Sequence, residues 1–295
     1  MKRVLFFVTV FSWLISLGVS ANAEGTAPVA ENLELTTYRN VSVGGQFSAY
    51  DPDGNVADYE ITTQPVKGSI QKNKDGSFVY TPCEDKKGRD YFGYKAIDAD
   101  GNYSQEATVI IKIEKQKKDV TYFDVDGTPE EYYAVALSEA GIYTGEQIGN
   151  VYCFEPEREV KRGEFISMCM MAADEPVVSS VMNTGFTDDE SIREWMKPFV
   201  LAAAIKGIDT GNKGAFYSDA PISREEAVVT LNKVLRMNNV KYMELDSELE
   251  HETAQACANL NAVGITCEGT LITEGLTRIE AAQLLVNAMK VISKR

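Results

Sequence analysis

The hydrophobic pattern of the chain changes its period once, near residue 115. From residue 24 to about 114, apolar and polar side chains alternate, most clearly at Ala107, Val109, Ile111 and Ile113. Alternation with period two is typical of strands with one buried face. Gly and Asp interrupt the pattern at intervals typical of a small β-sandwich. We therefore expect an all-β domain over residues 24–114.

Residues 115–119 (KQKKD) contain no apolar side chain and are interpreted as a linker. Beyond them the apolar spacing becomes that of helices, because three to four residues separate neighbours along a buried helix face. One such stripe comprises Ala281, Leu284, Leu285, Ala288 and Met289. The pattern predicts a second, all-α domain over residues 120–295.

The helical half repeats itself at about 120–175, 184–238 and 243–293. A Gly-Ile pair recurs at 141–142, 207–208 and 264–265, and an Arg-x-Glu sequence follows each pair, after a gap that shortens from 21 to 17 to 14 residues. A gap of variable length indicates a loop between two helices. Three helix–loop–helix units would bury their apolar stripes against one another, which predicts a pseudo-threefold bundle.

The Arg-x-Glu sequences lie at predicted helix starts. Ser223 with Glu226, and Thr277 with Glu280, form capping boxes, in which hydroxyl and carboxylate satisfy the first amides of a helix. Glu164 holds the same place in the first unit, where Lys161 replaces the hydroxyl. Helix capping therefore explains the Ser, Thr and Glu of these motifs.

Capping does not explain Arg162, Arg224 and Arg278, because a cation is unfavourable at the positive end of a helix. One interpretation is that each guanidinium and its helix start jointly bind an anion. The other is that each arginine pairs with a nearby acidic side chain. The recurrence of the arginine in three units favours the anion site.

Composition limits the function. The chain has 295 residues and a net charge of −15, with 15 basic and 28 acidic side chains in residues 121–295, so nucleic acid is not an expected partner. The sequence has a single histidine, His251, and this count excludes sites that need two imidazoles. We find no nucleophile elbow, phosphate loop or dinucleotide turn, and expect no catalysis.

The first 23 residues resemble an export signal. Lys2 and Arg3 precede an apolar run, and Ala21-Asn22-Ala23 is a small-x-small cleavage site. No later stretch approaches the roughly 20 apolar residues of a membrane span. We therefore expect a secreted protein. Five cysteines cannot all pair within one chain, and free thiols are favoured over a Cys257–Cys267 bridge.

The repeated residues resemble the S-layer homology (SLH) module of bacterial surface proteins. The second unit carries the motif most fully, at Phe186, Asp188, Trp195, Gly207-Ile208, Gly211, Phe216 and Ile222-Ser223-Arg224-Glu225-Glu226-Ala227. The first unit keeps Asp124, Gly145 and Arg162 but lacks the tryptophan, and the third has Glu252 in its place. The resemblance spans about residues 120–293.

This resemblance implies grooves between repeats that bind a secondary cell-wall polysaccharide, often one with a pyruvylated sugar. The arginines Arg162, Arg224 and Arg278 would hold the anion. The other glycan-binding residues that the motif implies are Asp124, Asp188, Trp195, Gly145 and Gly211.

The first half resembles the cadherin-like bacterial immunoglobulin-type repeat over about residues 27–114, most specifically in the run Asp75-Gly76-Ser77-Phe78-Val79-Tyr80-Thr81-Pro82. Such domains are mostly spacers or adhesive modules. Two Asp-x-Asp-Gly turns could place carboxylates around Ca²⁺, at Asp51, Asp53, Asp98 and Asp100. Simple turns are the more common role of this sequence.

We therefore expect a secreted, non-enzymatic surface protein in which an immunoglobulin-like or cadherin-like sandwich is joined to an SLH bundle that holds cell-wall glycan. No cofactor is expected apart from calcium. The alternative is a structural or protein–protein module whose degenerate repeats no longer bind glycan and instead contact other surface proteins.

Overall fold

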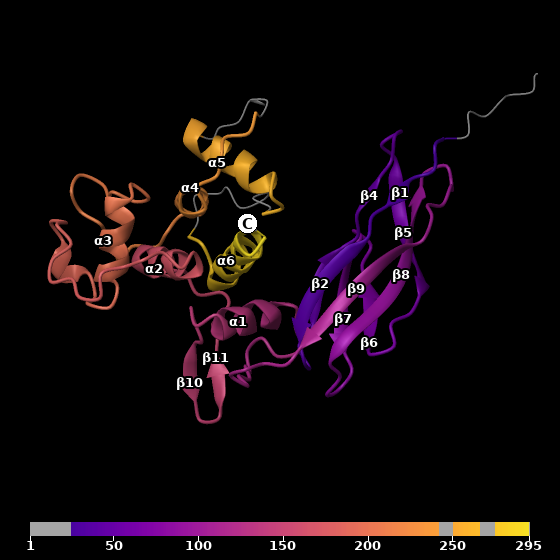
Figure 1. The fold of residues 1–295 in the computed structure, drawn as a ribbon, viewed down its shortest axis with the longest axis horizontal. Helices are drawn as coiled ribbons and strands as arrows, with labels where there is room; N and C mark the ends of the chain where they lie inside the picture. The colour runs from indigo at the N-terminus through magenta and orange to yellow at the C-terminus, as the bar shows by residue number, and fades with distance from the viewer. Residues whose placement is uncertain (1–24, 242–249, 266–274, 295) are drawn as a thin grey trace, which may run out of the picture.

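A computed structural model describes residues 25–241, 250–265 and 275–294. The chain forms a β-sheet region followed by a helical region, as expected, and Figure 1 shows the two lying side by side with α1 nearest the sheets. The signal-like segment 1–23 and Cys267 lie outside the described residues. Every helix in the described ranges is too short or too polar to cross a membrane.

The β-region contains two main sheets. The first has the order β2-β9-β8-β5, with β2 parallel to β9 and the other pairs antiparallel, and the second has the antiparallel order β3-β7-β6. A short pair, β1-β4, completes the region. The strand bounds are β1 Val29–Ala30, β2 Leu33–Tyr38, β3 Val43–Gln46, β4 Ala49–Tyr50, β5 Val56–Thr63, β6 Gly68–Lys72, β7 Ser77–Pro82, β8 Gly88–Asp98 and β9 Ala107–Glu114.

Aromatic side chains fill the space between these sheets. The ring centroid of Phe47 lies 4.6 Å from that of Phe78 and 4.4 Å from that of Tyr94. On β9, Ala107, Val109, Ile111 and Ile113 are all buried. The alternating pattern of this strand therefore identified its buried face, in which every second side chain enters the core.

The helical region consists of helix–loop–helix units. The first comprises α1 (Glu130–Glu139) and α2 (Arg162–Ala172), the second α3 (Lys197–Ile205) and α4 (Arg224–Val234), and the third α5 (His251–Asn261) and α6 (Arg278–Ile292). A hairpin of β10 (Glu146–Ile148) and β11 (Val151–Cys153) in the first loop, and a 3-10 turn η1 (Asp189–Ser191), are additions to the expected all-α pattern.

A closed ring of backbone hydrogen bonds joins the three units. The amide of Val160 donates to the carbonyl of Leu276 (2.9 Å), that of Leu276 to Ile222 (3.0 Å), and that of Ile222 to Val160 (3.0 Å). All three residues are buried and lie two positions before α2, α6 and α4. The ring gives the bundle its pseudo-threefold centre.

Each Gly-Ile pair ends a helix. Gly207, for example, has φ 67°, and the following amide of Ile208 donates to the carbonyl of Ala203 at 2.9 Å. This bond is the helix stop in which a left-handed residue lets the chain turn back, and glycine adopts that conformation without strain. The isoleucine then enters the core. The repeated pair therefore marks the turn between the first helix and the loop of each unit.

Candidate functional site

The three repeated arginines lie at the first positions of α2, α4 and α6, next to the central ring. Both capping boxes are present: Ser223 Oγ accepts from the Glu226 amide at 3.1 Å, and Glu280 Oε2 accepts from the Thr277 amide at 2.8 Å. In α2, Glu164 accepts from the Lys161 amide at 3.3 Å. The capping bonds orient the first turn, which directs each arginine toward a neighbouring unit.

Arg162 crosses from the first unit to the second. Its guanidinium contacts Asp209 at 2.6 Å and Glu226 at 2.7 Å, and lies 5.5 Å from the ring centroid of Phe216. Its side chain is 15% exposed and that of Asp209 8%, so this pair is mostly shielded from solvent. Two carboxylates therefore compensate one cation.

Arg224 crosses from the second unit to the third. Its Nη2 and Nε atoms donate to the same oxygen of Glu280, at 2.7 and 3.1 Å. Burial alone would raise the pKa of Glu280, but the hydrogen bonds from Arg224 and Thr277 outweigh it and lower the pKa. Glu280 therefore both caps α6 and fixes the arginine of the preceding unit.

Arg278 closes the circle by crossing from the third unit to the first. Its guanidinium contacts Glu155 at 2.9 Å, donates to the Phe154 carbonyl, and lies 4.7 Å from the ring centroid of Tyr143. The hydrogen bond from Arg278 lowers the pKa of Glu155. The residue is 3% exposed, the most buried of the three arginines. Its guanidinium is therefore part of the protein interior.

Every repeated arginine is thus paired with a carboxylate of another unit, which is the geometry of the acidic-pairing interpretation. The spacing of the motifs concealed these partners because they lie 47 to 123 residues away. One signal was overlooked: Tyr143 and Asp209, which contact Arg278 and Arg162, each follow a Gly-Ile pair directly. In these two units, the residue after the pair contacts an arginine of another unit.

Asp124 and Asp188 have equivalent roles in their loops. Asp188 accepts from the amides of Phe216 (2.8 Å) and Tyr217 (2.7 Å), and Asp124 from those of Phe154 (2.9 Å) and Glu155 (2.6 Å). Burial would raise the pKa of Asp124, but these backbone bonds outweigh it and lower the pKa. In this structure both carboxylates hold the loop that approaches an arginine.

Gly145 and Gly211 also serve these loops. Their φ angles are 93° and 69°, and a methyl group at either would collide with a backbone carbonyl, of Cys153 or Ala215 respectively. Trp195 lies just before α3 and is 50% exposed. It is therefore the member of the implied glycan-binding set whose side chain extends furthest into solvent.

The four aspartates of the β-region serve its turns. Asp51 Oδ1 accepts from the Asp53 amide at 2.7 Å, and Asp98 Oδ1 accepts from those of Asp100 (3.0 Å) and Asn102 (2.7 Å). In the described ranges, no three His, Cys, Asp or Glu side chains form a group that could hold a metal ion. Two oxygens at this end, Asp51 Oδ2 and Asn55 Oδ1, are buried without a hydrogen-bond partner.

The described cysteines differ in their exposure to solvent. Cys83 is exposed and Cys169 buried, and neither is in a disulfide bond. Burial raises the pKa of the Cys169 thiol. Cys153 donates from Sγ to Asp124 at 3.3 Å. The Cys257–Cys267 alternative falls partly outside the described residues.

Two family models match the chain, one in the β-region and one in the helical region. Residues 25–115 match the bacterial cadherin-like domain, and residues 185–228 match the S-layer homology domain. The chain therefore contains a cadherin-like domain followed by an SLH domain, as the sequence motifs indicated. Both domains are non-catalytic, and an SLH domain indicates association with the cell surface or cell wall.

Solved structures resemble parts of the chain. A point mutant of the SrpA adhesin from Streptococcus sanguinis is 20% identical, covering 33% of this chain and 66% of its own, with a TM-score of 0.26. The endo-fucoidan hydrolase MfFcnA4 is 20% identical (32% and 15% covered, TM-score 0.25), and the Clostridium thermocellum CbhA fibronectin(III)-like modules are 16% identical (33% and 52%, TM-score 0.22). This chain spans about two thirds or less of each. Among curated proteins, none matches.

Proposed function

We propose that the protein is secreted and held at the cell wall by non-covalent binding of a wall polysaccharide between its helical units, with the β-region as a spacer. The observation that carries this proposal is the SLH match at residues 185–228, which includes Arg224 and its capping box. Arg224 lies where the second and third units meet, next to Glu280. A groove at this junction, as the SLH resemblance implies, is the proposed binding site.

The charges at this groove suggest how a sugar would be recognised. A guanidinium offers only donors and a carboxylate only acceptors, so the Arg224–Glu280 pair can serve both the oxygen and the hydrogen of sugar hydroxyls. A pyruvyl carboxylate would instead compete with Glu280 for Arg224. Recognition through hydroxyl groups therefore requires no displacement of the ion pair, and a pyruvylated sugar would have to replace it.

Replacing Arg224 with alanine should weaken binding to isolated cell walls about 10- to 100-fold, because a hydrogen bond to a charged group contributes about 1.5–3 kcal/mol. The measurement is co-sedimentation of the protein with cell-wall sacculi, before and after chemical removal of the secondary polymer. Arg236→Ala is the matched control, since Arg236 follows the same helix and pairs with Glu175 at 2.7 Å with a side chain 70% exposed.

Loss of binding with both the polymer and the arginine would support the glycan anchor. Binding that survives both changes would refute it and favour the alternative, in which the helical units contact other surface proteins. Unfolding of each variant is followed by circular dichroism, so that a folding defect is not mistaken for lost recognition.

We also propose that Asp51 and Asn55 contribute to a Ca²⁺ site, because buried oxygens without partners call for a water or an ion, and Ca²⁺ accepts carboxylate and amide oxygens. Millimolar Ca²⁺ should raise the melting temperature of the β-region relative to EDTA, and Asp51→Asn should abolish that rise. Asp75→Asn, in another turn of the same region, is the control. An identical melting temperature with Ca²⁺ and EDTA would reject the site.

A further inference from the structure

Lys290 and Lys294, near the end of α6, have no carboxylate partner among the residues that the structure describes, although the helical half of the chain is acidic. Fourteen Lys and Arg side chains are described between residues 120 and 294, and ten of them form ion pairs with Asp or Glu. The other two without such a pair, Lys213 and Lys241, lie apart from each other in the sequence. Only at the end of α6, where Lys294 lies in the turn just after the helix, do two cations without a carboxylate partner lie four residues apart in the described ranges.

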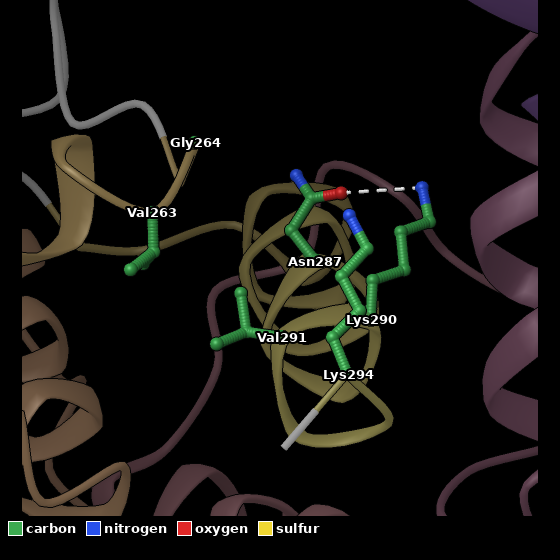
Figure 2. A pocket seen from close by; sticks show the side chains of 6 residues that line it. All are labelled: Val263, Gly264, Asn287, Lys290, Val291 and Lys294. Atoms are coloured by element: carbon green, nitrogen blue, oxygen red, sulfur yellow. Dashed lines mark hydrogen bonds between the residues drawn. The ribbon is translucent and has the colours of Figure 1, made fainter. Parts of the chain in front are cut away.

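These lysines line a pocket of about 510 Å³ with Asn287, Val291 and the end of the α5 turn at Val263 and Gly264. Figure 2 shows the two ammonium groups and the Asn287 amide gathered on the same side of α6. Lys290 Nζ donates to Asn287 Oδ1 at 3.4 Å. The asparagine oxygen thus faces a cation, and its NH₂ group, which Figure 2 shows on the other side of the amide, remains available as a donor toward the rest of the pocket.

The electrostatics of a helix end favour one lysine at this position but not two. A cation near a helix C-terminus is favoured by the helix dipole. Like charges four residues apart repel, however. Burial, and then repulsion from Lys294, lower the pKa of Lys290. An anion between the two ammonium groups would remove this repulsion.

A second cavity, at the junction between the β-region and the helical region, shares both lysines with this pocket. Its volume is about 450 Å³, and it adds Tyr132, Tyr133 and Glu34 of β2. Lys290 Nζ lies 5.1 Å from the centroid of the Tyr132 ring. Aromatic rings with a few charged groups are typical of ligand sites, and such rings can pack against the apolar face of a sugar.

We propose that this junction groove binds an anionic saccharide, with Lys290, Lys294 and the Asn287 amide contacting its carboxylate or phosphate group and the half-buried Tyr133 packing against its ring. The site is separate from the arginine groove proposed above, because it lies at the opposite end of α6 from Glu280, the partner of Arg224. Its anionic ligand can therefore be a sugar that the arginine groove does not recognise.

Binding is tested by titrating the full chain, in low salt, with oligogalacturonate as the carboxylate probe, a short glycerol-phosphate polymer as the phosphate probe, and maltohexaose as the neutral probe. The double variant Lys290→Gln/Lys294→Gln should weaken binding of the preferred anionic probe at least tenfold. The matched control Lys213→Gln/Lys241→Gln removes the same charge and should change affinity less than twofold. Preference between the two anionic probes identifies the group that is bound.

Two further variants sharpen the test. Glu34→Gln should strengthen binding severalfold, since it removes a negative charge from the groove lining. Arg224→Ala should leave it unchanged, which separates this site from the wall-binding groove. Added salt should weaken the binding because the contacts are between charges in partly exposed positions.

Absence of binding by both anionic probes, equal binding of maltohexaose, or equal losses in the two lysine double variants would each overturn the proposal. Loss of binding in Arg224→Ala would also overturn it, by assigning the anion to the arginine groove.

Discussion

Replacing Asp189 with alanine should lower the free energy of unfolding of the helical region by about 3–5 kcal/mol, the usual cost of leaving a buried charge without its partner. Asp189 Oδ2 lies 2.6 Å from Lys197 Nζ, and Oδ1 accepts from the amide (2.7 Å) and hydroxyl (2.6 Å) of Thr184. Asp189 is 7% and Lys197 9% exposed. Alanine would therefore leave an ammonium group and two donors buried near Met182, whose carbonyl is the remaining acceptor.

The measurement is urea unfolding followed by circular dichroism. Asp219→Ala is the control, because Asp219 pairs with Lys161 at 2.7 Å but its side chain is 54% exposed, and exposed pairs contribute about 0–1 kcal/mol. Adding Lys197→Met to Asp189→Ala should recover much of the loss by removing the stranded charge. Equal effects of the Asp189 and Asp219 variants would contradict the buried-pair explanation.

The same pair makes stability sensitive to acid. The hydrogen bond from Lys197 is the main cause that lowers the pKa of Asp189 from 3.8 to about 2. The unfolded chain then binds the proton first, so the contribution is fully present above pH 4 and is lost as pH falls toward 2. The Asp189→Ala variant should lose less stability than the wild type over that interval.

Replacing Glu131 with glutamine should stabilise the protein by about 2–3 kcal/mol at pH 8 and have little effect at pH 4. Glu131 is 5% exposed in the first turn of α1, and burial raises the pKa of its carboxyl from 4.5 to about 7, although the Gly127 amide donates to it at 3.1 Å. The folded state therefore holds this proton more tightly than the unfolded state. Stability is lost as pH rises from 4.5 through 7, by about 1.4 kcal/mol per pKa unit.

Unfolding by urea at several pH values between 4 and 8 measures this difference. Glu130→Gln removes the same charge from the same helix turn and is the matched control. Glu131 lines a cavity of about 180 Å³ at the junction with the β-region, together with Arg39, Asp119 and Asp126. Parallel stability curves for Glu131→Gln and the wild type over this range would show that folding does not raise the pKa of this carboxyl.

The sequence predicted well those features that depend only on residues close to one another along the chain. The buried face of β9, the two hydroxyl capping boxes and the helix stripe at residues 281–289 each depend on residues within about one to two turns. The recurrence of these local signals then predicted three helix–loop–helix units. Fold class could be predicted because each element repeats its own short-range rule.

The partners of the arginines depend on contacts between units, which local spacing does not encode. Arg162 could have paired with many of the 28 acidic side chains in its half of the chain, and the packing of three units selects Asp209 and Glu226. Asp124 and Asp188 were assigned to glycan binding by resemblance, and their bonds to loop amides became evident only from the fold. The junction lysines followed no motif, so only the assembled surface indicated them.

The ring formed by Val160, Ile222 and Leu276 sets the number of units. Linear repeat arrays have free ends, to which further repeats can be added and which need capping. A closed circle has no free end: each unit receives one central bond and donates another. Val160 and Leu276 must therefore meet before the circle closes, and bringing such distant residues together favours slow, all-or-none folding for a bundle of short helices. Gain or loss of a single unit would break the circle, so this architecture changes by altering loops and surfaces, as the unequal loops of the three units illustrate.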